Sequence, residues 1–439
     1  MKVLMLSWEY PPRVVGGIAR VVHELSKKLV MQGHDVSVIT YRDGNDVPYE
    51  EIEDGVKVYR VDNYLINPKD FLGWIMQLNF NMAAKATELI NEGEEFDVVH
   101  AHDWLTCYAA KTIKNSHKIP LTATIHATEA GRNSGIHNED QRYVNDTEWL
   151  LTYEADQVIV NSNFMNKDTQ RLFNMTQEKV KTIPNGIDLD KFEGFDRDYS
   201  FRRNYAADNE KIILTLGRIV QEKGIQHLIA AMPKIMKYYH DVKLVIGGKG
   251  PKMDDLKRLV RDLGVENKVY FAGFISGDDL QRMYKSADVS VFPSTYEPFG
   301  IVALEAMLAG IPTVVSDIGG LDEIVSHKVD GMKAYAGNSN SLADSILEVL
   351  HDKDLADKVV KNASRKVKEL FNWDRISEMT ADVYEESIKK FNEKLALEEK
   401  RKENELLGIK EDITTKILRK DEELPAESFK ITADEYPQN

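Results

Sequence analysis

The sequence predicts an α/β protein in which two doubly wound parallel sheets follow one another along the chain. Three observations carry this prediction. Short apolar runs alternate with segments of helical periodicity, these runs lack polar alternation, and the pattern restarts after a polar stretch at residues 188–211. Uninterrupted Val, Ile and Leu runs are typical of strands buried on both faces, and intervening helices favour right-handed crossovers. The length of 439 residues allows two or three domains.

Seven strands are expected in the first half of the chain. The start of the sequence has a brief apolar run and then Glu9, which is too short for a signal peptide and fits a first buried strand. A helix is predicted over residues 18–31. The expected strands are residues 3–6, 36–40, 56–61, 98–101, 121–125, 158–160 and 180–183.

Six strands are expected in the second half, separated by helical segments. This half repeats the alternation of the first, so we predict a second domain of the same kind. The strands are residues 212–216, 243–246, 269–271, 289–292, 312–315 and 331–334. The helices include residues 225–238, 254–263, 276–286, 302–308 and 341–350.

The domain boundaries follow from these patterns. We expect a first domain at residues 1–193, a linker within 188–211 and a second domain at 194–375. A helix that begins near Asn372 and continues to about Phe391 is expected to complete the first domain. Of the last 48 residues 22 are charged, so residues 392–439 are expected to be a solvated helix with a disordered end.

Composition excludes several classes of protein. The formal charge of −15 disfavours a main role in binding nucleic acid or anionic membrane. The longest apolar stretch, residues 301–315, is broken by Glu305 and Pro312 and cannot span a bilayer. Cys107 is the one cysteine, which excludes an intrachain disulfide and a cysteine zinc site and favours the cytoplasm.

Polar residues follow nearly every predicted strand, where open α/β sheets bind ligands. Two such rims facing each other would form a deep interdomain cleft. Gly16 and Gly17 precede a helix, so a ligand can approach the backbone closely. Arg218 and Lys223 follow a strand of the second half, and two fixed cations there suit a diphosphate leaving group. Each pair also has a simpler explanation. Gly16 and Gly17 fit an ordinary tight turn, and Arg218 and Lys223 fit solvated charges at the surface.

Two glutamates form the most specific pattern. Glu297 lies in a loop before Pro298, and Glu305 lies eight residues later in an apolar helical segment. Burial of an acid such as Glu305 costs free energy unless its carboxylate has partners. Ribose hydroxyls of a ligand could be these partners, and so could a cation in a buried salt bridge. His126, at the end of a strand, fits a ligand contact or a satisfied histidine.

Two patterns of the sequence resemble metal sites but do not meet the requirements of one. His23-Glu24 lacks a second histidine at helical spacing. In His100-Ala101-His102-Asp103 we expect neighbouring side chains to point to opposite faces of the strand. No metal is therefore predicted.

The combined motifs resemble the retaining nucleotide-sugar glycosyltransferases of the two-Rossmann GT-B fold. The resemblance covers about residues 1–391. It rests on Phe292-Pro293-Ser294 through Glu297-Pro298-Phe299-Gly300 to Glu305, on Gly217-Arg218 and Lys223-Gly224, and on Pro184-Asn185-Gly186. His102-Asp103-Trp104 and the segment from Thr124 to Arg132 look like glycogen and starch synthases.

The resemblance implies roles for the matching residues. Arg218 and Lys223 would bind the donor diphosphate, and Glu305 the ribose. Glu297 and His126 would meet the transferred sugar, so these two and the two cations are the implied catalytic set. The implied substrate-binding residues are Gly16, Gly17, Asp103, Asn185, Phe274, Phe299, Gly300, Ile301 and Glu305.

The resemblance implies a hexosyltransferase that moves glucose from a nucleoside-diphosphate sugar to an α-1,4-glucan. No cofactor and no metal would be needed. Two departures leave other acceptors open: Val14 stands where bacterial glycogen synthases have lysine, and Phe299 where they have cysteine. The alternatives are a family 4 transferase acting on a small, surface-polysaccharide or lipid-linked acceptor, a nucleotide-sugar epimerase, a phosphorylase and a non-catalytic sugar-binding protein.

Overall fold

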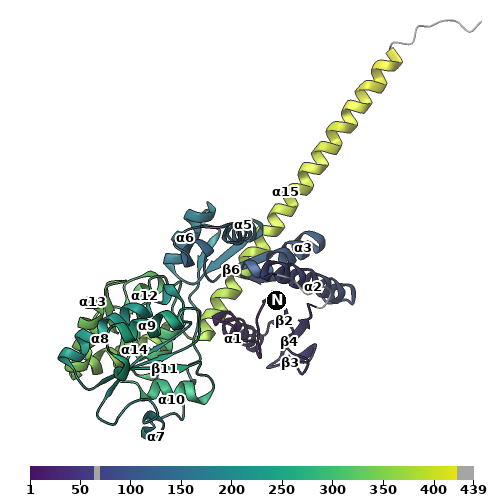
Figure 1. Cartoon of the computed structure of the whole chain (residues 1–439). Coiled ribbons are helices and arrows are strands. Elements are labelled where there is room, and N and C mark those ends of the chain that lie inside the picture. The colour runs from purple at the N-terminus through teal and green to yellow at the C-terminus, as the bar shows by residue number, and fades with distance from the viewer. Residues whose placement is uncertain (64–69, 423–439) are drawn as a thin grey trace, which may run out of the picture. The chain divides into compact units, whose positions relative to one another are not determined.

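Two parallel sheets, each covered by helices, make up the computed structural model of the chain (Figure 1). The structure describes the backbone of residues 1–63 and 70–422, and side chains as far as residue 404. Residues Met1–Ile388 form one compact unit. The predicted disordered end of the tail lies outside the described residues.

The first sheet has eight strands in the order β3-β4-β2-β1-β5-β6-β7-β8, all parallel except β3. Its strands are β1 (Lys2–Leu6), β2 (Asp35–Tyr41), β3 (Glu50–Glu53), β4 (Val56–Val61), β5 (Val98–His102), β6 (Leu121–Ile125), β7 (Gln157–Val160) and β8 (Val180–Thr182). The helices are α1 (Gly17–Met31), α2 (Phe71–Asn91), α3 (Cys107–His117), α4 (Glu129–Arg132), α5 (Glu139–Glu154) and α6 (Asn163–Phe173), with a 3₁₀ turn at Trp104–Thr106.

The second sheet has six parallel strands in the order β11-β10-β9-β12-β13-β14. They are β9 (Lys211–Leu216), β10 (Val242–Gly247), β11 (Val269–Gly273), β12 (Val289–Phe292), β13 (Thr313–Ser316) and β14 (Met332–Ala334). The helices are α7 (Tyr199–Arg202), α8 (Ile225–Tyr238), α9 (Met253–Asp262), α10 (Asp278–Ser286), α11 (Ile301–Ala309), α12 (Gly319–Ile324), α13 (Ser339–His351), α14 (Lys353–Leu370) and α15 (Trp373–Glu422). Gln221–Lys223 and Glu266–Lys268 are 3₁₀ turns.

Alternate residues of β1 enter two different cores. Leu4 and Leu6 pack with residues of α2, α3 and α5, whereas Val3 and Met5 pack with residues of α1 and of the beginning of α15. Both faces of a central strand are therefore buried, which explains why its sequence shows no polar alternation.

The sequence analysis did not predict a short edge strand. Strand β3 pairs antiparallel with β4, with Glu53 opposite Val56. The two residues between them, Asp54 and Gly55, both have positive φ angles of 50° and 84°. An Asp-Gly pair in this conformation is a strong hairpin signal, so the sequence did contain the information.

The segment predicted as a linker is packed against the second sheet. Phe192, Phe201 and Ala206 belong to its buried core. Asp288 accepts hydrogen bonds from Arg197 at 2.9 Å and from Arg202 at 3.3 Å. The segment is therefore held in place, because the buried carboxylate of Asp288 pairs with two of its arginines.

Helix α15 returns to the first sheet and runs as one helix to Glu422, so the helix expected to end near Phe391 is continuous with the helix expected in the tail. Its Tyr384 hydroxyl lies 2.7 Å from Nδ1 of His100, and Ser387 hydrogen-bonds to Thr122 at 2.8 Å. His100 and His102 lie with ring centroids 4.1 Å apart. The expected alternation of adjacent residues does not separate these two histidines, because residues two apart share a face of a strand.

Burial of His100 predicts an acid-sensitive fold. Burial, with a smaller effect of His126, lowers the pKa of His100 to about 3 from 6.5. The unfolded chain therefore binds a proton more readily, and stability falls as pH drops from 6.5 toward 3, by at most about 1.4 kcal/mol per pH unit for this residue.

We expect His100→Gln to flatten the dependence of unfolding free energy on pH between 6.5 and 4.5, measured by urea denaturation. Tyr384→Phe removes a hydrogen bond but keeps the histidine, so it should lower stability at every pH and leave the slope unchanged. Equal slopes in His100→Gln and the parent protein would contradict the argument.

Candidate active site

The predicted residues follow strands at the carboxyl edges of the two sheets. Asp103 and His126 follow β5 and β6 of the first sheet, and Arg218 and Glu297 follow β9 and β12 of the second. Because the carboxyl ends of parallel strands lie at one edge, each sheet gathers its loops on one side.

Glu297 and Lys223 form a close, largely buried ion pair. Nζ of Lys223 lies 2.6 Å from Oε2 of Glu297, and the Ser294 hydroxyl donates to the same oxygen at 3.2 Å. Lys223 ends a 3₁₀ turn, which places its side chain beside the loop after β12. A carboxylate with two donors is fixed in orientation.

Arg218 occupies a different position from Lys223. Its side chain is 58% exposed, and its guanidinium lies 3.7 Å from Glu222 in a long ion pair. Such a pair contributes little at the surface. The structure therefore brings Lys223, but not Arg218, to Glu297.

Glu305 is buried on α11 with three partners. Oε1 pairs with Nη1 of Arg20 at 3.2 Å and with Nζ of Lys191. Oε2 accepts a hydrogen bond from the Tyr284 hydroxyl at 2.7 Å. These contacts match the salt-bridge alternative, and the ribose role of Glu305 stays a prediction.

Asp103 has a strained backbone, with a φ angle of 60° that is unusual for a residue other than glycine. Its Oδ1 accepts a hydrogen bond from the main-chain N–H of His126 at 2.7 Å, and Arg132 lies 4.0 Å from Oδ2. In this backbone conformation the Asp103 carboxylate binds the main chain of His126, where the loop after β6 begins.

His126 is buried and neutral. Burial lowers the pKa of its imidazole, although the Asp103 charge opposes this shift. Its Nε2 lies 3.1 Å from Nδ1 of His102, and its carbonyl accepts from Asn161 at 3.1 Å. A neutral imidazole held in this way can exchange hydrogen bonds with a sugar hydroxyl but carries no charge to offer it.

The glycine pair before α1 is organised by Glu9, a residue that the sequence analysis did not select. Its buried carboxylate accepts hydrogen bonds from the N–H groups of Val15 at 2.5 Å and Gly16 at 2.8 Å. Burial raises the pKa of Glu9, and these hydrogen bonds oppose the shift. A Cβ on Gly17 would lie 3.5 Å from Ile301, so this loop lies beside the first turn of α11.

Tyr296 connects the loops of the two sheets and was also missed. Its hydroxyl accepts a hydrogen bond from Thr128 N at 3.2 Å. A Cβ on Gly131 would lie 2.4 Å from its ring, so only glycine fits there. The loop that carries Glu297 and the loop that follows His126 are thus in direct contact. No local pattern in the sequence signals this pairing.

Glu148 on α5 is a further buried acid near this contact. Both of its carboxylate oxygens lie within 3.1 Å of the Glu129 N–H. Burial raises the pKa of Glu148 to about 8, against the effects of that hydrogen bond and of Arg132. A neutral acid at this place supports the start of α4 without adding charge beside Asp103.

The remaining predicted residues stand apart from this group. Phe274 is 63% exposed after β11. Phe299 packs in the core, with its ring centroid 6.0 Å from that of Phe371, so its main chain alone is open to a ligand role. Asn185 precedes Gly186, where a Cβ would lie 2.5 Å from the Trp373 ring. Among the described residues, no hydrogen bond or ion pair joins Asn185 to Glu297 or His126.

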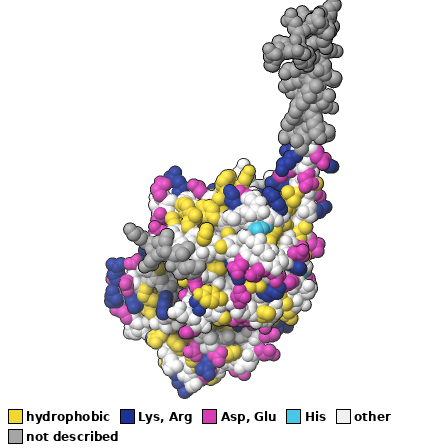
Figure 2. Space-filling view, turned by 90° about the vertical axis from the view of Figure 1, so that its right-hand side faces the viewer, with side chains coloured by type: hydrophobic (Ala, Val, Ile, Leu, Met, Phe, Trp, Pro, Cys, Tyr) yellow, Lys and Arg dark blue, Asp and Glu magenta, His cyan; other side chains and the backbone are white. Residues whose placement is uncertain are grey.

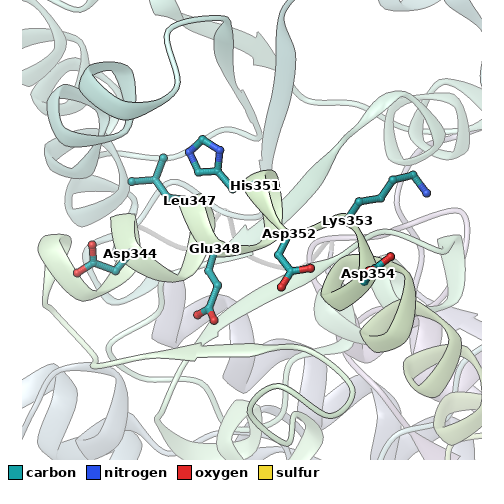
Figure 3. A pocket seen from close by; sticks show the side chains of 7 residues that line it. All are labelled: Asp344, Leu347, Glu348, His351, Asp352, Lys353 and Asp354. Atoms are coloured by element: carbon teal, nitrogen blue, oxygen red, sulfur yellow. The ribbon is translucent and has the colours of Figure 1, made fainter.

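The cavity drawn in Figure 3 is not part of this site. It has a volume of about 530 Å³ and lies where α13 meets α14 (Figure 3).

Among the described residues, including those around this cavity, no group of three or more His, Cys, Asp or Glu side chains could hold a metal ion. The cavity is lined by Asp344, Leu347, Glu348, His351, Asp352, Lys353 and Asp354.

No helix in the described part of the chain is long and apolar enough to cross a membrane. On the face shown in Figure 2, positive and negative side chains are interspersed. The view gives no large surface of one charge, in keeping with the charge distribution of an ordinary globular protein.

Comparison with known proteins gives a consistent result. An uncharacterized glycosyltransferase of Methanocaldococcus jannaschii is 44% identical over 388 residues, which cover 88% of this chain and 98% of that protein. A glycogen synthase of Mycobacterium tuberculosis is 34% identical over 397 residues, with coverage of 88% and 94%. The solved sucrose-phosphate synthase of Thermosynechococcus elongatus has a TM-score of 0.74 at 25% identity and covers 88% of this chain and 98% of its own.

Two family models match in succession. The model of Glycosyltransferase Family 4 matches residues 15–191, and that of Glycosyl transferases group 1 matches residues 196–366. The predicted fold of two Rossmann-like domains is thereby confirmed. The chain belongs to the glycosyltransferases of the GT-B fold.

Proposed function

We propose that this glycosyltransferase transfers a hexose, with glucose as the favoured sugar, from a nucleoside-diphosphate donor to the non-reducing end of an α-1,4-glucan, with retention of configuration. The similarity to a mycobacterial glycogen synthase supports the choice of glucan. The observation that carries the proposal is the buried pair of Lys223 and Glu297, whose loop contacts the loop after His126.

The chemistry follows from where charge develops. A bond forms between the acceptor oxygen and the anomeric carbon, while the bond from that carbon to the diphosphate oxygen breaks. The leaving phosphate oxygen takes the acceptor proton, so no separate base is required. Lys223 would neutralise the diphosphate, and Arg218, held only by a long pair with Glu222, is free to turn toward it.

The first turn of α11 would assist this step. Gly300 has a φ angle of 110° and ends the loop so that the N–H groups of the next residues point out of the helix. An unpaired helix N-terminus favours an anion. Glu297, paired with Lys223, would accept hydrogen bonds from hydroxyls of the transferred sugar.

The direct test is sugar transfer from UDP-glucose and ADP-glucose, each with and without glycogen or maltooligosaccharide, in EDTA. We expect incorporation that requires the glucan and persists in EDTA, because fixed cations replace a metal. Donor hydrolysis without transfer would instead favour the alternative of a small or lipid-linked acceptor. A complete absence of turnover with both donors would contradict the proposed donor class.

Lys223→Ala should lower kcat by two to three orders of magnitude, since removal of one preorganised charge-stabilising donor has that effect in other enzymes. Lys353→Ala is the matched control, because that side chain is exposed on α14. Circular dichroism and thermal unfolding check that the variant is folded. A folded Lys223→Ala enzyme with normal turnover would refute the role of this lysine.

A further inference from the structure

Three buried histidines lie close together at the carboxyl ends of β5 and β6. His100 and His102 are on β5, and His126 follows β6. Burial lowers the pKa of each imidazole below its usual 6.5, so the three rings are neutral at pH 7. A neutral imidazole carries one proton, on Nδ1 or on Nε2. The position of that proton decides which nitrogen donates a hydrogen bond and which accepts one.

His102 and His126 share one hydrogen bond. Nδ1 of His102 lies 3.1 Å from Nε2 of His126. One of these two nitrogens must carry a proton and the other must be bare, because two bare nitrogens or two N–H groups cannot form a hydrogen bond. Two arrangements are therefore possible, and they leave the proton of His126 on different nitrogens.

The second nitrogen of His102 distinguishes the two arrangements. This atom, Nε2, is buried and has no hydrogen-bond partner. If His126 donated to His102, the one proton of His102 would be on Nε2, and a buried N–H group would have no acceptor. If His102 donates from Nδ1, its Nε2 has only an unpaired lone pair. Buried N–H groups without a partner are rarer in folded proteins than unpaired acceptors, which favours donation by His102.

Donation by His102 leaves the proton of His126 on Nδ1. The hydrogen bonds of His126 to described residues involve its Nε2, its main-chain N–H and its carbonyl, and none of them involves Nδ1. The main-chain bond to Asp103 also fixes the residue at the start of the loop. Nδ1 is therefore the ring nitrogen that remains for a ligand, and it offers a proton rather than a lone pair.

We propose that His102 is a positioning residue that holds His126 in the tautomer protonated on Nδ1, so that His126 donates a hydrogen bond to an oxygen of the transferred sugar. The contact with the sugar rests on the proposed function. The tautomer does not, because it follows from the histidine pair alone. A fixed donor needs no proton rearrangement when the sugar binds, which is the advantage of a preorganised site.

The first test reads the tautomer without any ligand or turnover. In the full chain labelled with ¹⁵N-histidine, a protonated and a bare ring nitrogen differ widely in ¹⁵N chemical shift. The chain has 11 histidines, and the signals lost in His126→Gln and in His102→Asn assign the two rings. We expect His126 to be protonated on Nδ1 and bare on Nε2 at neutral pH. A proton on Nε2 of His126 would overturn the proposal.

The second test separates positioning from packing. His102→Asn keeps an N–H donor near the place of Nδ1, because the asparagine amide nitrogen is also two bonds from Cβ. His102→Leu fills similar space without a donor. We expect His102→Leu to lower kcat about tenfold, the effect of one lost hydrogen bond, and to give His126 mixed tautomers. His102→Asn should restore most of the rate and the single tautomer.

His100→Gln is the matched control, because His100 is a buried histidine of the same strand whose hydrogen bonds go to Tyr384 and Thr124. It should leave kcat and the tautomer of His126 unchanged. Equal losses of kcat in His102→Asn and His102→Leu would overturn the positioning role, and so would a loss of the same size in His100→Gln. The expected tautomer in a chain that transfers no sugar would contradict the proposed function and still support the role of His102 in fixing the His126 ring.

Discussion

The ion pair of Lys223 and Glu297 depends on a backbone contact that only glycine permits. A Cβ on Gly224 would lie 1.9 Å from the Pro293 carbonyl oxygen, and its φ angle is 67°. Gly319 and Gly320 also approach this loop closely. A Cβ on Gly319 would lie 2.2 Å from the main-chain carbonyl oxygen of Glu297, and a Cβ on Gly320 would lie 2.4 Å from Cα of Phe299. The loop is therefore clamped by backbone on two sides, and the carboxylate cannot drift from its cation.

This clamp also sets the place of the contact between the two sheets. Tyr296 directly precedes Glu297, so the same constraint fixes the ring against Gly131 and Thr128. Ser162, at the start of α6, donates to the Pro298 carbonyl at 2.7 Å and extends the contact. This short loop thus carries the Glu297 carboxylate and also the residues that contact loops of the first sheet. Several constraints therefore act on the same few residues.

The sequence predicted most strands of both sheets because each is an uninterrupted apolar run, a local property. It missed β3, whose glutamate-rich strand has no apolar run. Glu297, Glu305 and Lys223 were selected from their places after strands or in an apolar helix, and from the family resemblance. Arg20 and Lys191 were not, since they are 285 and 114 residues from Glu305. Such partners arise from tertiary packing, which no short motif encodes.

The edge of the first sheet has a consequence for association between copies of the chain. An edge strand exposes unpaired backbone groups that invite another strand to pair. In β3, three of four residues are glutamates, and Ile52 is exposed among them. If two copies met along this edge, glutamates would oppose glutamates at close range. Charged side chains on an edge strand disfavour such pairing, so this edge is protected against fibrous growth in that direction.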